Sequence, residues 1–174
     1  MRIHIVGCGL LGSGLAFKLC KYDLCSHMYI YDSDIVETCH FPYMKAFIGT
    51  NKVDALSSVI DSLDCDVRLF SRCVRVTSRR KFRSGLVVDC RDNKSIPIEC
   101  NIRLSLDGPV FVVDCRKDVS VDTYSEYVMN QDPAYCDLAL SIALNFVTKC
   151  QDTMSEEKRF VYMLDSILNY STSM

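Results

Sequence analysis

Three glycines near the amino terminus constrain the fold more than any other feature of the sequence. They lie in the segment Gly7-Cys8-Gly9-Leu10-Leu11-Gly12, and Asp32 follows twenty residues later. In a strand–turn–helix unit, the first glycine permits the tight turn, the second lets the backbone approach phosphate, and the third lets helix and strand pack closely. The pattern predicts a nucleotide-binding fingerprint, with the phosphates at the amino terminus of a helix.

The residues around the glycines fit this unit. Residues 1–6 form a strand-like run, residues 10–22 carry leucines at helical spacing, and a second strand-like run, 27–31, ends at Asp32. A carboxylate at the end of the second strand accepts hydrogen bonds from ribose hydroxyls in such folds.

The rest of the chain alternates between strand-like and helical segments. Helical spacing is found in three further segments: 46–63, 132–150 and 155–168. Apolar runs typical of strands are found at 67–76, 86–90 and 110–115. Residues 96–106 fit either a helix or a strand that forms a hairpin with 110–115 across Asp107-Gly108.

This alternation predicts an α/β fold: a Rossmann-like, doubly wound, mostly parallel sheet with helices on both faces. We expect residues 1–174 to form a single compact domain. Residues 1–93 carry the motifs, and residues 94–174 are expected to complete the sheet and to contribute two terminal helices.

Composition limits the class of protein. The net charge is −2, and no run of 18 apolar residues exists, which argues against a membrane span. The chain has eleven cysteines but no Cys-x-x-Cys pair, so we expect buried free thiols rather than a structural zinc site. The apolar amino-terminal run forms the fingerprint and is not interpreted as a signal peptide. These features favour a reduced, cytoplasmic protein with neither membrane nor nucleic acid as an expected partner.

Charged residues follow several of the predicted strands. Asp34 lies two residues after Asp32, Lys52 lies near the start of a predicted helix, and Asp92 follows the strand-like run 86–90. The carboxyl ends of parallel strands share one crevice in a doubly wound sheet. An ammonium group there would lie against phosphates, and the Asp92 carboxylate would hold Mg²⁺ against triphosphate oxygens.

Taken together, four motifs make the sequence resemble the ThiF/MoeB group of the ubiquitin-activating enzyme-like superfamily. All four lie within residues 1–93: Gly7-Cys8-Gly9-Leu10-Leu11-Gly12, Asp32-Ser33-Asp34, Gly49-Thr50-Asn51-Lys52 and Asp89-Cys90-Arg91-Asp92-Asn93. The resemblance implies ATP and Mg²⁺ as cofactors. It implies an adenylyltransferase that activates the C-terminal carboxylate of a small protein or peptide, either ubiquitin-like or sulfur-carrier-like. It also implies a homodimer.

The resemblance implies a role for each matching residue. Lys52 and Asp92 would be catalytic, with Lys52 on the phosphates and Asp92 on the magnesium ion. Nucleotide binding is further implied for seven residues: Gly7, Gly9, Leu10, Leu11, Gly12, Asp32 and Asp34. Such chemistry consists mainly of positioning and of neutralising phosphate charge.

The segment 39–44 departs from the family pattern. Tyr43 stands where the family has a phosphate-binding arginine, and Pro42 stands where it has an asparagine. His40 and Lys45 are the nearby candidates to replace the lost cation. Loss of one such group lowers the rate by roughly 10²–10³. Three interpretations therefore stay open: an active adenylyltransferase, a degenerate relative that binds nucleotide or a protein partner, and an NAD-dependent oxidoreductase.

Two further features have both a functional and a structural interpretation. Cys136 lies just before a predicted helix. We interpret it as one of eleven cysteines that lies there by chance, rather than as a thiol that accepts the activated acyl group. A basic stretch without acids is interpreted as a solvated strand edge rather than as a landing site for a phosphate-rich partner, since only Phe70 and Phe82 lie nearby. Its members are Arg68, Arg72, Arg75, Arg79, Arg80, Lys81 and Arg83.

Overall fold

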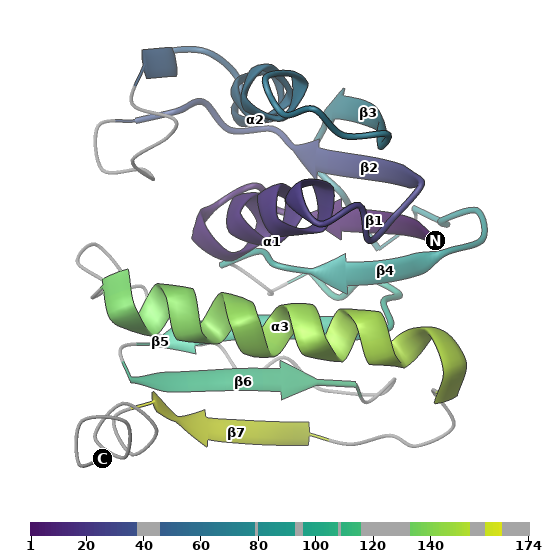
Figure 1. Cartoon of the computed structure of the whole chain (residues 1–174), viewed down its shortest axis with the longest axis vertical. Coiled ribbons are helices and arrows are strands. Elements are labelled where there is room, and N and C mark those ends of the chain that lie inside the picture. Colours follow the sequence, from purple (N-terminus) through teal and green to yellow (C-terminus); the bar gives the residue numbers. More distant parts are fainter. Residues whose placement is uncertain are drawn as a thin grey trace.

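A seven-stranded sheet runs through the described part of the chain (Figure 1). The computed structural model describes residues 1–37, 46–78, 80–92, 96–107, 109–115, 133–153 and 159–164. The strands are β1 (Arg2–Val6), β2 (His27–Asp32), β3 (Arg68–Cys73), β4 (Leu86–Asp89), β5 (Ile102–Asp107), β6 (Val110–Asp114) and β7 (Arg159–Met163). The helices are α1 (Leu10–Lys21), α2 (Lys52–Asp61) and α3 (Pro133–Thr153).

The strand order is β3-β2-β1-β4-β5-β6-β7. Strands β1 to β5 pair in parallel, while β6 and β7 are antiparallel to their neighbours. The predicted single-domain α/β fold with a mostly parallel, Rossmann-like sheet is therefore confirmed.

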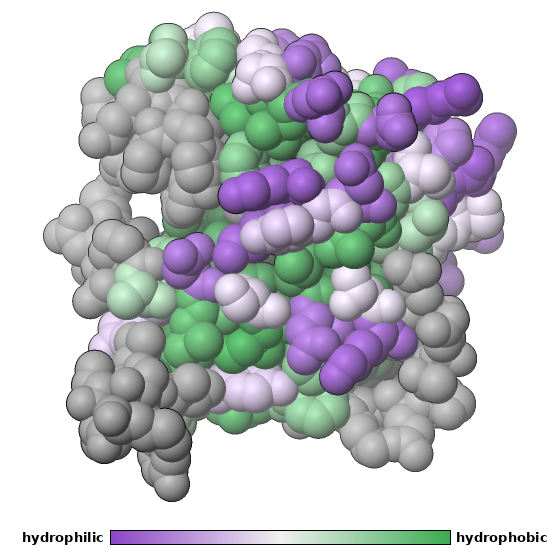
Figure 2. All heavy atoms as spheres, in the orientation of Figure 1, coloured by the Kyte–Doolittle hydropathy of each residue, from purple (hydrophilic) through white to green (hydrophobic). Residues whose placement is uncertain are grey.

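The three helices lie side by side on one face of the sheet, with α1 between α2 and α3 (Figure 1). Their buried side chains pack on the sheet in the main core, which includes Ile5, Leu15, Leu19 and Leu56. Their outward surfaces carry bands of hydrophilic side chains with hydrophobic ones between them (Figure 2). Among the described residues, no helix is both long enough and apolar enough to cross a bilayer.

On the opposite face of the sheet, no helix lies among the described residues. A smaller hydrophobic cluster lies there, made of Val6, Tyr31, Val76, Val87 and Ile98. The connection from β3 to β4 over residues 74–85 is too basic to give an apolar helical stripe, so it covers the sheet as an irregular segment. Within the described ranges, the predicted placement of helices on both faces thus holds for one face only.

The second helix begins later than predicted. It was expected over residues 46–63, but α2 begins at Lys52, because Gly49 has φ +87° and the chain before it forms turns. The apolar stripe of Val53, Leu56 and Ile60 is buried, as its spacing predicted.

The ambiguous segment 96–106 forms the hairpin alternative. Residues Ile102–Asp107 are β5, paired antiparallel with β6. Alternate residues of β5 are buried, which is the period of a strand with one face on the core.

The second predicted terminal helix, over residues 155–168, is not found at residues 159–163, which form a strand; apart from Leu164, the rest of that range lies outside the described residues. Arg159–Met163 forms β7, antiparallel to β6. The Phe146 ring of α3 lies 4.9 Å from the Phe160 ring and 6.2 Å from the Tyr162 ring, measured between ring centroids. Val161 and Met163, between and after them, are exposed. The alternation was missed because apolar residues four apart satisfy both the helical and the strand period.

The first terminal helix is confirmed as α3, but its buried stripe is shifted by one position. The spacing predicted a stripe of Leu138, Ile142 and Phe146, which are partly buried. The fully buried residues are Cys136, Ala139, Leu140, Ala143 and Val147. Small residues here let the helix lie close to α1 and to the sheet.

Candidate functional site

The glycine loop between β1 and α1 has the close contacts that its sequence predicted. Gly7 has φ +92°, and a Cβ there would lie 2.9 Å from the backbone nitrogen of Arg91. A Cβ on Gly12 would lie 1.8 Å from the carbonyl oxygen of Gly7, so only glycine fits where α1 crosses the turn. Gly9 has open space, since the nearest atom to a Cβ at that position would be Asp92 Oδ2 at 3.9 Å.

The amino terminus of α1 is open to an anion. Gly9 caps the helix without a side-chain hydrogen bond, and the first turn contains no acidic residue. The first backbone amides of an α-helix have no partner inside the helix, and they carry partial positive charge. This end of α1 is therefore suited to phosphate.

Asp32 ties the glycine loop to the loop that follows β2. Its Oδ2 accepts a hydrogen bond of 2.6 Å from the amide of Cys8, and its Oδ1 accepts one of 2.8 Å from the amide of Asp34. A carboxylate has about four acceptor positions, so both oxygens keep capacity for hydroxyl donors. Burial and the Asp32 charge raise the pKa of the Cys8 thiol well above its ordinary value, which keeps that thiol protonated.

Lys52 is a buried cation at the amino terminus of α2. Only 7% of the residue is exposed, and Nζ lies 3.4 Å from Oδ2 of Asp34, whose side chain is 66% exposed. The backbone amide of Lys52 also donates to the Asp34 carbonyl oxygen at 2.9 Å. The loop after β2 thus fixes both the helix start and the ammonium group.

The loop after β4 is held by an ion pair. The Arg91 guanidinium donates to both carboxylate oxygens of Asp89 at 2.9 Å and to the Ile96 carbonyl oxygen at 2.9 Å. Asp89 is almost fully buried, so removal of either partner would leave an uncompensated charge. Asp92, next in the chain, is exposed and faces Gly9.

These groups surround a cavity of about 350 Å³ at the carboxyl ends of the parallel strands. Six of the residues predicted from the sequence line it: Gly7, Gly9, Asp32, Asp34, Lys52 and Asp92. The side chains of Leu10 and Leu11 do not, because Leu11 is buried and Leu10 packs against the core. Only their backbone amides belong to the open helix terminus. Gly12 acts through packing alone.

Several lining residues were not predicted. The most informative is Arg75, an exposed cation on the segment after β3. Its neighbours Val74 and Val76, together with Ile96, form an apolar part of the cavity wall. The remaining unpredicted residues are Val6, Tyr31, Ser33, Cys90 and Arg91. Arg75 could have been predicted from the sequence, because it lies at the carboxyl end of the strand expected over residues 67–76. In a parallel sheet, that end of each strand faces the shared crevice.

The residues present fit a magnesium ion held with a nucleotide. Among the described residues, no group of three or more His, Cys, Asp or Glu side chains forms a metal site. Mg²⁺ in nucleotide sites is bound by one or two carboxylates plus phosphate oxygens and water, so Asp92 alone suffices as the protein ligand.

The remaining predicted residues lie elsewhere. Tyr43, His40 and Lys45 fall outside the described residues. Cys136 is buried in the main core on α3 and does not line the cavity, which agrees with a structural role.

No known protein family matches this sequence, and no curated protein matches it. The fold, in contrast, is similar to solved structures. PaaA is 15% identical with a TM-score of 0.65, over 94% of this chain and 72% of that chain. E. coli MccB in complex with MccA-N7isoASN is 14% identical with a TM-score of 0.65, over 93% of this chain and 64% of that chain.

A third similar structure is E. coli tRNA N6-threonylcarbamoyladenosine dehydratase, TcdA, in complex with ATP. It is 19% identical with a TM-score of 0.50, over 68% of this chain and 58% of that chain. PaaA, MccB and TcdA are members of the ThiF/MoeB-like fold family. The chain spans between 62% and 64% of the MccB chains, and at these identities the likeness establishes the fold.

Proposed function

We propose that this chain is a ThiF/MoeB-type protein that binds ATP with Mg²⁺ and adenylates the C-terminal carboxylate of a peptide or small protein. One observation carries the proposal: the open end of α1, the Lys52 ammonium group and the Asp92 carboxylate converge on one cavity. Structures of MccB and TcdA with ATP support the nucleotide, and structures of MccB with MccA support a peptide partner.

Each residue has a distinct task in this proposal. The first amides of α1 and the Lys52 ammonium group bind the phosphates, and Asp32 accepts hydrogen bonds from the ribose. Asp92 would hold Mg²⁺, which supplies charge neutralisation on the phosphate oxygens when bound. The wall formed by Val74, Val76 and Ile96 is suited to the base.

Adenylation requires the partner's carboxylate oxygen to attack the α-phosphorus while pyrophosphate leaves. The protein contributes by aligning these groups and by stabilising the negative charge that develops. Arg75 places a second cation at the cavity, in addition to Lys52. It is a candidate for the charge that the family's arginine supplies where this chain has Tyr43.

A degenerate, nucleotide-binding relative is the second candidate, and the Tyr43 substitution is the observation that favours it. The NAD-dependent oxidoreductase rests on Asp32 alone, so we do not propose it. A homodimer and a cytoplasmic location stay proposals that rest on the resemblance and on the cysteine content.

Calorimetric titration of ATP with and without Mg²⁺ tests the site. The variant Asp92→Asn should lose most of the increase in ATP affinity that Mg²⁺ provides. Asp54→Asn is the matched control, because Asp54 is exposed on α2 and does not line the cavity. If Asp92→Asn kept the full magnesium effect, the metal assignment would be wrong.

Pyrophosphate exchange into ATP separates the two candidates. Exchange that depends on added peptides with free C-termini supports the adenylyltransferase. ATP binding without exchange for any peptide supports the degenerate relative. Binding of NADH in preference to ATP would overturn both.

A further inference from the structure

The helix-free face of the sheet carries a row of aromatic rings across β1, β2 and β3. His4, Tyr29 and Phe70 occupy the same register position on these neighbouring strands. The His4 and Tyr29 ring centroids are 4.7 Å apart with planes at 19°, and those of Tyr29 and Phe70 are 4.6 Å apart with planes at 12°. The rings therefore form one continuous stack, with Phe70 at its outer end.

The other face of β3 establishes which way these side chains point. Ser71 Oγ lies 2.8 Å from Ser57 Oγ on α2, and Leu69 packs against the main core. Side chains alternate along a strand, so Arg68, Phe70 and Arg72 point to the helix-free side.

The stack is open at the edge of the sheet. In the sheet formed by the described residues, β3 is an edge strand with β2 as its one neighbour. His4 is buried, whereas Tyr29 and Phe70 are partly exposed, so accessibility increases toward the edge. One ring face of Phe70 therefore points away from the stack, where another planar ring can extend it.

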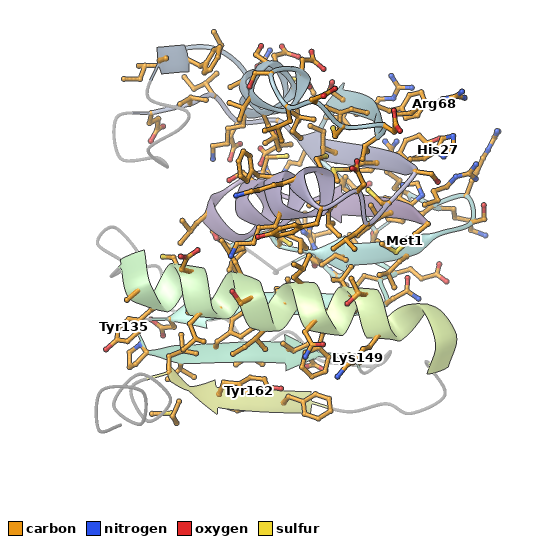
Figure 3. The ribbon with its side chains drawn as sticks, in the orientation of Figure 1. Met1, His27, Arg68, Tyr135, Lys149 and Tyr162 are labelled. Carbon is orange, nitrogen blue, oxygen red and sulfur yellow. The ribbon has the colours of Figure 1, made fainter. Side chains whose placement is uncertain are left out.

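Arginines surround this open end. Arg68 and Arg72 lie two residues before and after Phe70, about 7 Å along the strand on either side, and both are exposed. Arg68 shares its register row with His27 and Arg2, and Figure 3 shows His27 and Arg68 next to each other at the amino ends of their strands.

No acid lies close to these two arginines along the chain, since residues 67–88 contain no Asp or Glu. Among the described residues, neither Arg68 nor Arg72 forms a salt bridge, whereas Arg91 at the cavity end of this face pairs with Asp89. Arg80 lies over the Tyr31 ring at 4.5 Å and adds a further cation to this face. A polyanion with planar rings is complementary to this combination of cations and aromatic faces.

We propose that this face binds single-stranded RNA, with one base stacked on Phe70 and the flanking phosphates bound by Arg68 and Arg72. Single strands present unstacked bases to aromatic side chains and phosphates to cations, and RNA adds a 2′-hydroxyl for polar groups. His27 and Tyr29 place such polar groups beside the stack. The sequence did not show this, because Tyr29 and His4 come from strands distant from the basic stretch.

The surface adjoins the nucleotide cavity at Tyr31, which lines the cavity and shares its register row with Arg72, but Phe70 and Arg68 line no part of the cavity. The cavity is lined by Arg75 and by the carboxyl ends of the strands, whereas Arg68 lies at the amino end of β3 and lines no part of it. RNA binding therefore does not depend on the proposed adenylation, and variants of Phe70 and Arg68 should leave ATP binding unchanged.

Fluorescence anisotropy of a labelled 12-nucleotide single-stranded RNA, measured over a series of salt concentrations, tests the proposal. Phe70→Leu keeps an apolar side chain but removes the ring, and it should weaken binding about tenfold, while Phe70→Tyr should bind like the unaltered protein. The double variant Arg68→Gln/Arg72→Gln should lower the slope of log K against log salt by about 1.4.

A matched charge control lies on the other face. Lys18→Gln/Lys21→Gln removes two cations from α1, and it should leave the salt slope and the affinity unchanged. Thermal unfolding of each variant verifies that it is folded. Equal binding by Phe70→Leu and Phe70→Tyr would overturn the stacking. Tighter binding of DNA of the same sequence, or full competition by polyglutamate, would overturn the assignment to RNA.

Discussion

The replacement Lys52→Met separates the proposed nucleotide-binding role of this residue from its structural role. Methionine has a volume close to that of the lysine stem, so it fills the buried position without the charge. The backbone hydrogen bond from residue 52 to the Asp34 carbonyl oxygen does not depend on the side chain, so the start of α2 is kept.

The expected cost in stability is small. The partner carboxylate of Asp34 is 66% exposed, so its charge stays hydrated when the ammonium group is lost. An ion pair with an exposed partner contributes about 0–1 kcal/mol, which corresponds to a change in unfolding temperature of at most about 4 °C for a chain of this size.

The expected cost in binding is much larger. A hydrogen bond to a charged group contributes about 1.5–3 kcal/mol, and each 1.4 kcal/mol is a factor of ten in affinity. Lys52→Met should therefore weaken ATP binding by about 10- to 150-fold. The measurements are calorimetric titration with ATP and Mg²⁺, and a thermal melt of the same sample.

Lys18→Met is the control. Lys18 Nζ lies 3.2 Å from Asp137 Oδ1, in a similar ion pair between α1 and α3 that is remote from the cavity. This variant should match Lys52→Met in unfolding temperature and match the unaltered protein in ATP affinity. Equal ATP affinity in both variants would refute the assignment of Lys52 to the phosphates.

Three other outcomes follow from the structure. Gly12→Ala places a Cβ 1.8 Å from a carbonyl oxygen and should lower the free energy of unfolding in urea by about 3 kcal/mol, whereas Gly9→Ala meets only ordinary contacts and should keep stability while it weakens ATP binding. Burial lowers the pKa of His4 below 6.5, so as the pH falls the His4 side chain is protonated in the unfolded chain before it is protonated in the folded one. The free energy of unfolding that is linked to His4 is therefore complete above pH 6.5 and decreases below it. His4→Phe should remove this part of the dependence of the unfolding free energy on pH, measured in acid titrations. Iodoacetamide with mass spectrometry should label the exposed Cys73 long before Cys8, whose thiol pKa is raised by burial; faster labelling of Cys8 would contradict the described packing.

The sequence predicts the parallel half of the molecule well, because each element there has a local signal. The glycine spacing determines the turn between β1 and α1, and the acids at the ends of β2 and β4 mark the cavity. These signals work because residue type and local conformation coincide at the same positions, as at Gly7 with its positive φ and at Gly12 with its close contact.

The antiparallel half is predicted less well for a physical reason. The helical and strand periods share residues four apart, so Phe160 and Leu164 alone do not distinguish β7 from a helix. The helix-free face was also missed, because register between strands decides that Tyr29 and Phe70 stack. No local pattern contains that register.

The junction between the two halves of the sheet has a consequence for one substitution in α1. β4 and β5 pair at Val88 with Ile102 and at Asp89 with Arg103, and Asn101 adds two hydrogen bonds to Val87 just before these pairs. On the helix side, α1 and α3 approach where a Cβ on Gly14 would lie 2.5 Å from Leu140 Cδ1. The two halves of the sheet are therefore joined by a short strand pairing and by the packing of α3 on α1, so Gly14→Ala should displace the Leu140 side chain at that helix contact and leave the residues that line the cavity in place.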